Sequence, residues 1–269
     1  MQTSNDYPNV VYLAQLAAKA SEIMRSNFRC GMSRPCKDDG TPLTETDTAI
    51  NTLVLESIAK DYPHVAVLGE EGDQHVDGAE YRIVCDPVDG TIPFSRGIPV
   101  STFCISVLCG DEPLVALISD PFMERRWHAV RGGGAFLYDE TGIRPIKVSA
   151  HPELHRSNIS MIWWAGADYN LTLVATKLMD EKALWGNYLS VAIMGGLVGS
   201  GEYDASIFPG RRSLETPAMQ LIVEEAGGRA TDIHGNALRY GPKGETDGHI
   251  ISNGLIHDDL VGLVASCQG

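Results

Sequence analysis

Two carboxylates, a hydroxyl and a tight bend are encoded together in residues 86–91, Asp-Pro-Val-Asp-Gly-Thr. The apolar run 83–85 comes directly before this segment and predicts a buried strand that ends at Asp86. Because Pro87 keeps the residue before it extended and Gly90 permits a sharp turn, the two aspartates can point toward one position. Carboxylate and main-chain oxygens suit a hard cation such as Mg²⁺. Asp-Gly after a strand is also common turn chemistry, so this segment alone leaves both interpretations open.

Further acidic blocks accompany this segment in a fixed order. They are residues 37–47, which end in Asp47; residues 68–72, Leu-Gly-Glu-Glu-Gly; residues 214–218, Leu-Glu-Thr-Pro-Ala; and residues 225–228, Glu-Ala-Gly-Gly. In this order and spacing the blocks resemble the inositol monophosphatase family of Mg²⁺-dependent, lithium-sensitive phosphatases. The resemblance runs from about Lys37 to the end of the chain. The Gly-Glu-Glu and Asp-Pro-Val-Asp-Gly-Thr blocks are highly specific together, whereas the Leu-Glu-Thr-Pro-Ala block is degenerate.

The resemblance implies two or three Mg²⁺ ions held by oxygen ligands. It surrounds the first ion with Glu70, Asp86, the carbonyl of Val88 and Thr91. It surrounds the second ion with Asp86, Asp89 and Glu215. Glu70 would also orient water for a third, loosely held ion, with Glu71 as its solvated neighbour. Two metal ions suit a phosphate monoester because one can acidify a water molecule while the other stabilises the leaving alkoxide.

Thr91 and Asp47 are the expected proton-handling pair, and Glu70 joins them as an expected catalytic residue. A threonine hydroxyl can accept a hydrogen bond from water and donate one to a carboxylate. The resemblance pairs these two positions in the family. Asp47 has an alternative role, as an N-cap or first-turn acid of a helix that begins just before Ile50.

A helix is also expected to begin at Gly90 and Thr91, where free backbone N–H groups could bind phosphate. Pro93 falls in the first turn of that helix and removes one donor. Phosphate binding would therefore use Gly90 and Thr91. Lys37 and Arg96 could add positive charge nearby, although basic residues are commonly solvated.

Two positions depart from the family pattern. The last metal carboxylate of the family is usually an Asp preceded by Trp, whereas Leu214 and Glu215 stand here. Glutamate adds one methylene, which moves its carboxylate about 1.5 Å outward. A catalytic group misplaced by about 1 Å can cost on the order of 100-fold in rate. Either the backbone compensates or the second ion binds weakly.

The second departure concerns the substrate. In the inositol-hydrolysing branch, an acid seven residues before the last ligand contacts substrate hydroxyls, and Phe208 occupies that position here. Phenylalanine can stack or exclude water but cannot accept a hydrogen bond, whereas the nearby Arg211 offers positive charge. We therefore predict Phe208 and Arg211 as substrate-binding residues beside Gly90 and Thr91. The segments 125–127 and 131–136 resemble the histidinol-phosphatase branch.

The expected fold class is α+β. Helical periodicity marks residues 10–28 and 48–62, and strand-like runs follow at 65–68, 82–85, 102–108, 114–119, 126–130 and 135–137. The succession of these runs with short turns predicts a largely antiparallel sheet under the two helices. After residue 145, strand-like runs at 158–163, 205–207, 229–231 and 250–252 alternate with helical stretches. We predict an N-terminal α+β half (1–145) with most metal ligands and a C-terminal α/β half (146–269) with the last one. The resemblance implies a layered α/β/α/β/α sandwich with the active site between the halves.

Composition limits the possible partners. The 269 residues include 35 acidic and 21 basic ones, and the resulting net charge of −14 argues against nucleic-acid binding. We expect no membrane association, because no apolar run approaches the roughly 20 residues that span a bilayer. The N-terminus lacks a signal pattern, and the six cysteines are interpreted as free thiols, which together favour the cytoplasm. A homodimer is implied by the resemblance alone.

Two hypotheses follow. The first is a Mg²⁺-dependent phosphomonoesterase that hydrolyses a small phosphorylated polyol, sugar or amino alcohol with metal-activated water. Within this class, a histidinol-phosphatase and a bisphosphate phosphatase are both open. The alternative is a weakly active or inactive member that serves as a binding or regulatory module, which Glu215 and Phe208 motivate.

Overall fold

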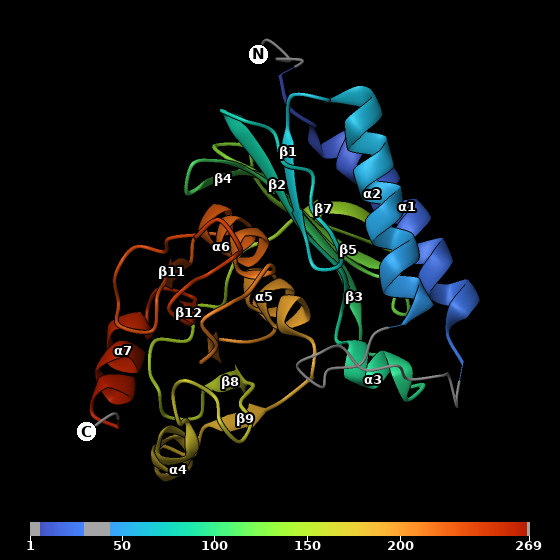
Figure 1. Cartoon of the computed structure of the whole chain (residues 1–269). Coiled ribbons are helices and arrows are strands. Elements are labelled where there is room, and N and C mark those ends of the chain that lie inside the picture. Colours follow the sequence, from blue (N-terminus) through green and yellow to red (C-terminus); the bar gives the residue numbers. More distant parts are fainter. Residues whose placement is uncertain (1–5, 30–43, 268–269) are drawn as a thin grey trace.

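The computed structural model describes residues 6–29 and 44–267, and these residues form two sheets between three layers of helices (Figure 1). The helices are α1 (Val10–Asn27), α2 (Glu45–Asp61), α3 (Thr91–Ser95), α4 (Thr172–Asp180), α5 (Val191–Gly199), α6 (Thr216–Glu225) and α7 (His257–Ala265). The first sheet holds β1 (Ala66–Gly69), β2 (Tyr81–Asp89), β3 (Thr102–Cys109), β4 (Glu112–Asp120), β5 (Arg125–Val130), β6 (Gly134–Asp139) and β7 (Gly142–Pro145). The second holds β8 (Asn158–Met161), β9 (Leu184–Gly186), β10 (Ala205–Phe208), β11 (Arg229–Thr231) and β12 (His249–Ser252).

The first sheet follows the order of the chain, from β1 to β7. Strand β1 pairs with β2 in parallel, and every later neighbour is antiparallel. Helices α1 and α2 cover one face. Helix α1 begins at Asn9, whose side chain accepts hydrogen bonds from the N–H groups of Val11 and Tyr12. The sequence predicted this largely antiparallel sheet under two helices, but it did not predict β7.

Strand β2 does not end at Asp86, as its sequence predicted, but continues to Asp89. Asp86 lies opposite Cys104, and Asp89 lies opposite Thr102. Three steps along β2 therefore match two steps along β3, which is a β-bulge with one extra residue. The bulge lets the strand carry both aspartates to one end of the sheet.

The second sheet has the order β11-β12-β10-β8-β9 and mixes both strand directions. In its centre, β10 and β12 run antiparallel, with Phe208 directly opposite His249. The edge strand β9 has three residues and was not predicted. The other four strands lie close to their predicted positions.

The elements stack in layers: α1 with α2, the first sheet, α5 with α6, the second sheet, and α4 with α7 (Figure 1). Three hydrophobic clusters fill the space between these layers. The cluster between the sheets includes the fully buried Trp127, and Gly196 of α5 lies so close that an added Cβ would come within 2.7 Å of the indole. This order of layers confirms the predicted α/β/α/β/α sandwich.

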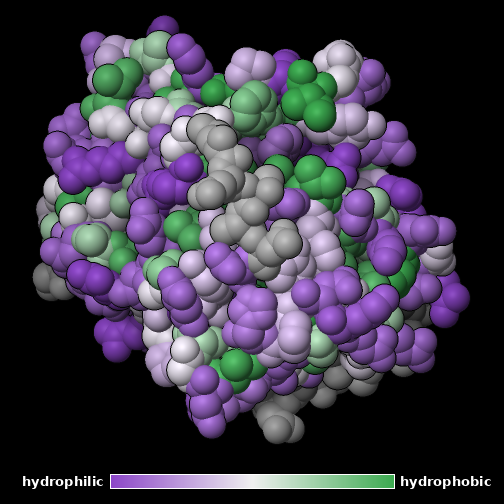
Figure 2. Space-filling model, turned by 90° about the horizontal axis from the view of Figure 1, so that it is seen from above, coloured by the Kyte–Doolittle hydropathy of each residue, from purple (hydrophilic) through white to green (hydrophobic). Residues whose placement is uncertain are grey.

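The surface is mixed in character. On the face seen from above, hydrophobic residues form small groups among hydrophilic ones (Figure 2). Among the described residues, no helix combines the length and the apolar composition that crossing a membrane requires.

Candidate metal centre

Asp86, Asp89 and Glu215 form a cluster in which one carboxylate oxygen from each lies within 4.8 Å of the others. The aspartates come from the bulged end of β2, and Glu215 is the N-cap residue of α6. The cluster thus joins the first sheet to a helix of the layer between the sheets. The three residues predicted as ligands of one ion are adjacent in the folded chain.

Asp89 is held by four hydrogen bonds. Its carboxylate accepts from the backbone N–H groups of Val191 at 2.8 Å and Ala192 at 2.9 Å, where α5 begins. The hydroxyls of Thr102, at 2.8 Å, and Ser190 also donate to it. Since a helix N-terminus favours negative charge, these four donors favour the ionised form of Asp89 and oppose the effect of its burial.

Gly90 is required for this arrangement. Its φ of +86° lies in the left-handed region, and an added Cβ would come within 2.9 Å of the Val100 carbonyl oxygen and 3.0 Å of the Leu189 carbonyl oxygen. Helix α3 begins at the next residue, Thr91, as predicted.

The buried cluster concentrates negative charge. Burial raises the pKa of Asp86 well above its ordinary value, and the charges of Glu70, Glu215 and Asp89 raise it further. Burial and the charge of Asp89 raise the pKa of Glu215 to about 7. Burial also raises the pKa of Asp89, although its four hydrogen bonds oppose the shift.

Within residues 6–29 and 44–267, no lysine or arginine forms an ion pair with Asp86, Asp89 or Glu215. Buried carboxylates without a cationic partner are costly, and a divalent cation removes that cost. The donor set consists of oxygen atoms alone, which fits Mg²⁺.

A second cluster unites Asp47, Glu70 and Glu71, again with one oxygen from each within 4.8 Å of the others. Asp47 is fully buried, and the two glutamates are partly buried. Glu71 was predicted to be a solvated neighbour, so the sequence interpretation missed its place in this cluster. The signal available was the Glu-Glu pair directly after β1. Glu70 lies in this cluster, and its charge also acts on the pKa of Asp86.

Asp47 combines the two roles that its sequence left open. Its Oδ2 accepts a hydrogen bond from the backbone N–H of Thr44 at 2.9 Å, which completes a capping box at the start of α2. Its Oδ1 lies 3.3 Å from the hydroxyl of Thr91. That hydroxyl is also 3.0 Å from the carbonyl oxygen of Val88, so Thr91 can donate to either acceptor.

The predicted substrate residues of the second half lie in different environments. Phe208 is buried, with 6% of its surface exposed, and its ring packs between Trp164 and His249. This differs from the expectation, because a ring covered on both sides offers little area to a substrate. The side chain of Arg211 is 63% exposed and lies 3.6 Å from Asp247 in an ion pair.

Of the basic residues considered for phosphate binding, Arg96 is exposed and Lys37 lies outside the described residues. Among the cysteines, Cys85 and Cys104 are buried free thiols, and Cys109 and Cys267 are partly exposed. Cys30 and Cys36 lie outside the described residues.

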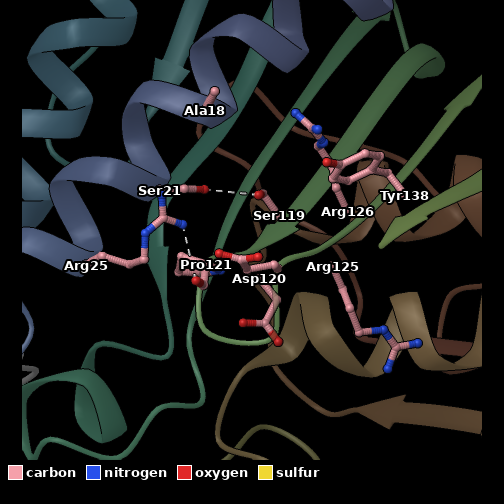
Figure 3. A pocket seen from close by; sticks show the side chains of 10 residues that line it. Ala18, Ser21, Arg25, Ser119, Asp120, Pro121, Arg125, Arg126 and Tyr138 are labelled. Carbon is pink, nitrogen blue, oxygen red and sulfur yellow. Dashed lines mark hydrogen bonds between the residues drawn. The ribbon is translucent and has the colours of Figure 1, made fainter. Parts of the chain in front are cut away.

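A separate pocket of about 220 Å³ lies between α1 and strands β4, β5 and β6 (Figure 3). Arg25, Arg125 and Arg126 line it, and the hydroxyls of Ser21 and Ser119 lie 3.1 Å apart within it. None of the carboxylates of the two clusters lines this pocket. We therefore assign the candidate chemistry to the carboxylate clusters.

Comparison with known proteins identifies the family. The model of the inositol monophosphatase family matches residues 7–268. The chain belongs to this family. A histidinol-phosphatase of Mycobacterium tuberculosis is 34% identical over 255 residues, which cover 91% of this chain and 94% of that protein. An inositol monophosphatase of Dictyostelium discoideum is 29% identical over 203 residues, which cover 72% of each protein.

The solved structure of an IMPase from Thermotoga maritima has the same fold, with a TM-score of 0.83 at 23% identity. The superposition covers 96% of this chain and 97% of that one. Because the family and its named relatives are phosphatases, this chain is a phosphatase, that is, a phosphoric monoester hydrolase. The resemblance inferred from the acidic blocks is thereby confirmed.

Proposed function

We propose that this phosphatase is Mg²⁺-dependent and hydrolyses a small phosphorylated amino alcohol, sugar or polyol, with histidinol phosphate as the first compound to test. The observation that carries the proposal is the buried cluster of Asp86, Asp89 and Glu215, which has no lysine or arginine ion pair within the described residues. Such a charge arrangement calls for a divalent cation.

The residues that would hold two or three ions are Glu70, Asp86, the carbonyl of Val88, Asp89 and Glu215, to which we add Glu71. When bound, Mg²⁺ would supply positive charge that acidifies water and offsets the charge of the phosphate and the leaving oxygen.

Thr91 and Asp47 would move the proton. When the Thr91 hydroxyl donates to Asp47 Oδ1, 3.3 Å away, its lone pairs can accept a hydrogen bond from the attacking water. The capping box holds the Asp47 carboxylate in place, because its Oδ2 already accepts a hydrogen bond from the N–H of Thr44, the N-cap residue of α2. Glu70 would orient the water from the neighbouring position.

The substrate class rests on the relatives and on the loop before Glu215. The relative at 34% identity is named a histidinol-phosphatase. Arg211 is flanked by Asp168 at 3.8 Å and Asp247 at 3.6 Å. An amino alcohol phosphate carries both a positive ammonium group and a negative phosphate. The mixed charges around Arg211 therefore suit it better than a polyol phosphate, which has neutral hydroxyls in place of the ammonium group. We retain Gly90, Thr91 and Arg211 as substrate-binding residues.

The test is phosphate release from histidinol phosphate, inositol 1-phosphate, fructose 1,6-bisphosphate, adenosine 3′,5′-bisphosphate and an aryl phosphate, each with Mg²⁺ and with a chelator. We expect Mg²⁺-dependent turnover with one substrate well above the others. Turnover that survives chelation would overturn the metal dependence. No turnover of any substrate would favour the binding-module alternative.

Four further properties belong to this proposal. We propose that the chain divides into the halves 1–145 and 146–269, which is supported by the connection between β7, which ends at Pro145, and β8, which begins at Asn158. The buried free thiols Cys85 and Cys104 support a cytoplasmic location. A homodimer can be tested by sedimentation, and lithium sensitivity can be tested in the same phosphate-release assay.

A further inference from the structure

Glu215 is the end of a chain of hydrogen bonds whose other members are buried. Its Oε2 accepts from the hydroxyl of Ser213 at 2.7 Å, and the hydroxyl of Thr216 lies 2.7 Å from that of Ser213. The hydroxyl of Thr216 in turn lies 2.9 Å from Nδ1 of His249, which comes from strand β12. Ser213, Thr216 and His249 are all buried, with at most 3% of their surface exposed.

The hydrogen bonds in this series all donate in one direction, toward Glu215. An ionised Glu215 only accepts hydrogen bonds, so Ser213 must donate to it, and each hydroxyl has a single proton. Thr216 then donates to Ser213, and Nδ1 of His249 must donate to Thr216. This requires the neutral imidazole with its proton on Nδ1. Burial supports the neutral form, because it lowers the pKa of His249 to about 3.

The second ring nitrogen of His249 is consistent with this tautomer. Nε2 is buried and has no hydrogen-bond partner in the described part of the chain. With the proton on Nδ1, the unpartnered atom is an acceptor. With the proton on Nε2, a buried N–H would lack an acceptor and Thr216 would lose its donor. Orphaned buried N–H groups are rarer than under-satisfied acceptors.

Phe208 fixes the imidazole. It lies directly opposite His249 in the β10–β12 ladder, and the two rings stack with centroids 5.4 Å apart and an interplanar angle of 28°. The ring of Trp164 packs at 5.9 Å from Phe208 on its other side. The two departures from the family pattern, Phe208 and Glu215, therefore lie at the two ends of one connected set of side chains.

We propose that Ser213, Thr216, His249 and Phe208 are positioning residues that hold the longer carboxylate of Glu215 at its metal-binding position. This inference rests on the proposed function, because it takes Glu215 to be a metal ligand. The side chain of glutamate has one more rotatable bond than that of aspartate, so a fixed donor must select one conformation. Partners of metal ligands of this kind typically contribute 10–100-fold to metal affinity.

The test is calorimetric titration of Mg²⁺ into the full chain, with thermal unfolding of the metal-free protein measured in parallel. We expect Ser213→Ala to weaken Mg²⁺ binding at least tenfold. Thr216→Val and His249→Leu should also weaken Mg²⁺ binding. Thr216→Ser and His249→Asn keep a donor at the same position and should retain wild-type affinity.

Ser206→Ala is the matched control, because Ser206 lies on β10 near Phe208 and its buried hydroxyl has no hydrogen-bond partner in the described part of the chain. It should leave Mg²⁺ affinity unchanged. A purely structural role would give a different pattern, because it would lower the unfolding temperature of the metal-free variants without changing the Mg²⁺ affinity of the folded protein.

A double-variant experiment gives the sharpest result. Because aspartate at position 215 is one methylene shorter, we expect it to lose the hydrogen bond from Ser213, and Ser213→Ala should then have no further effect on Mg²⁺ affinity in a Glu215→Asp background. Equal effects in both backgrounds, or wild-type affinity of Ser213→Ala, would overturn the positioning chain and leave the proposed function standing. Absence of Mg²⁺ binding by the wild-type protein would overturn the proposed function itself.

Discussion

Asp89 and Glu215 belong to one carboxylate cluster but are held in different ways. Asp89 has a short side chain, and two backbone N–H groups at the start of α5 bind it directly. Glu215 has a longer side chain, and it receives a side-chain hydrogen bond from Ser213, two residues before it. Two backbone N–H groups thus help two hydroxyls, those of Thr102 and Ser190, to position one carboxylate, whereas the other receives its hydrogen bond from a side chain that belongs to a longer chain of side chains.

This difference indicates where the centre tolerates substitution. Backbone donors do not change when side chains are replaced, so the Asp89 side of the cluster constrains the identity of the carboxylate strictly. The Glu215 side depends on residues that can vary together, which allows a glutamate at a position where the family usually has aspartate. The following predictions test this contrast.

The largest effect is expected for Asp89→Asn. The substitution removes the negative charge from the most firmly held position, and we expect kcat in the Mg²⁺-dependent assay to fall by on the order of 100-fold or more. Asp139→Asn, on strand β6 outside both clusters, is the matched control and should be close to wild type. Retention of more than about a tenth of wild-type activity would contradict the assignment of Asp89.

A smaller loss is expected for Glu215→Gln. Glutamine preserves the length of the side chain and its hydrogen bond from Ser213 but removes the charge. We expect Mg²⁺ affinity to fall about tenfold, because Asp86 and Asp89 remain in the cluster. Calorimetric titration measures this directly. An equal loss of Mg²⁺ affinity in Asp89→Asn, titrated in the same way, would show that the two sides of the cluster are equally constrained.

Gly90→Ala, on the Asp89 side of the cluster, should lower the free energy of unfolding by about 1–3 kcal/mol. The added Cβ would make close contacts at a position where the backbone is in the left-handed region. Thermal unfolding measures the effect. Gly110→Ala is the control, since Gly110 also has a positive φ, of +58°, but no atom within 4 Å of an added Cβ. If both variants lose the same stability, the contacts with Val100 and Leu189 contribute nothing.

The smallest effect is a pH dependence of the metal-free protein. The pKa of Glu215 is raised from 4.5 to about 7, so between these values the folded state keeps a proton that the unfolded state has lost. The contribution of Glu215 to the free energy of unfolding is therefore most favourable below about pH 4.5. It decreases as the pH rises toward 7, with a slope of at most about 1.4 kcal/mol per pH unit. Denaturant unfolding in chelator should show this slope, and Glu215→Gln should reduce it. An identical slope in the variant would assign the effect to Asp86 instead.

Much of the centre could be predicted because its parts are local in sequence. The two aspartates, the left-handed glycine and the threonine that begins α3 lie within residues 86–91. The capping role of Asp47 was visible in the same way, since Thr44 stands three residues before it. The approach of Thr91 to Asp47 followed from the family resemblance.

The environments of Glu71 and Phe208 could not be read from the sequence. That both adjacent glutamates join one cluster depends on the turn after β1, where the Asp73 side chain accepts a hydrogen bond from the N–H of Gly69. Phe208 faces His249 only because β10 and β12 pair in one register. Registers between distant strands are set by tertiary packing and leave no local signal.

The same limit explains the missed strands. Strands β7 and β9 have four and three residues and lie at sheet edges, so their hydrophobic pattern is too short to detect. The long strands of the first sheet were predicted to within a few residues, apart from the bulge that extends β2. Its length depends on pairing with β3 rather than on residues 86–89 themselves.

The hydrogen bonds between Asp89 and the start of α5 also have a consequence for folding. They connect residues 102 and 103 positions apart, so a large loop must close before the Asp89 carboxylate reaches its native partners. Contacts of such high sequence separation form slowly. We therefore expect the centre to be among the last parts of the molecule to assemble, so that a chain that is still folding exposes its acidic segments without the geometry to hold an ion.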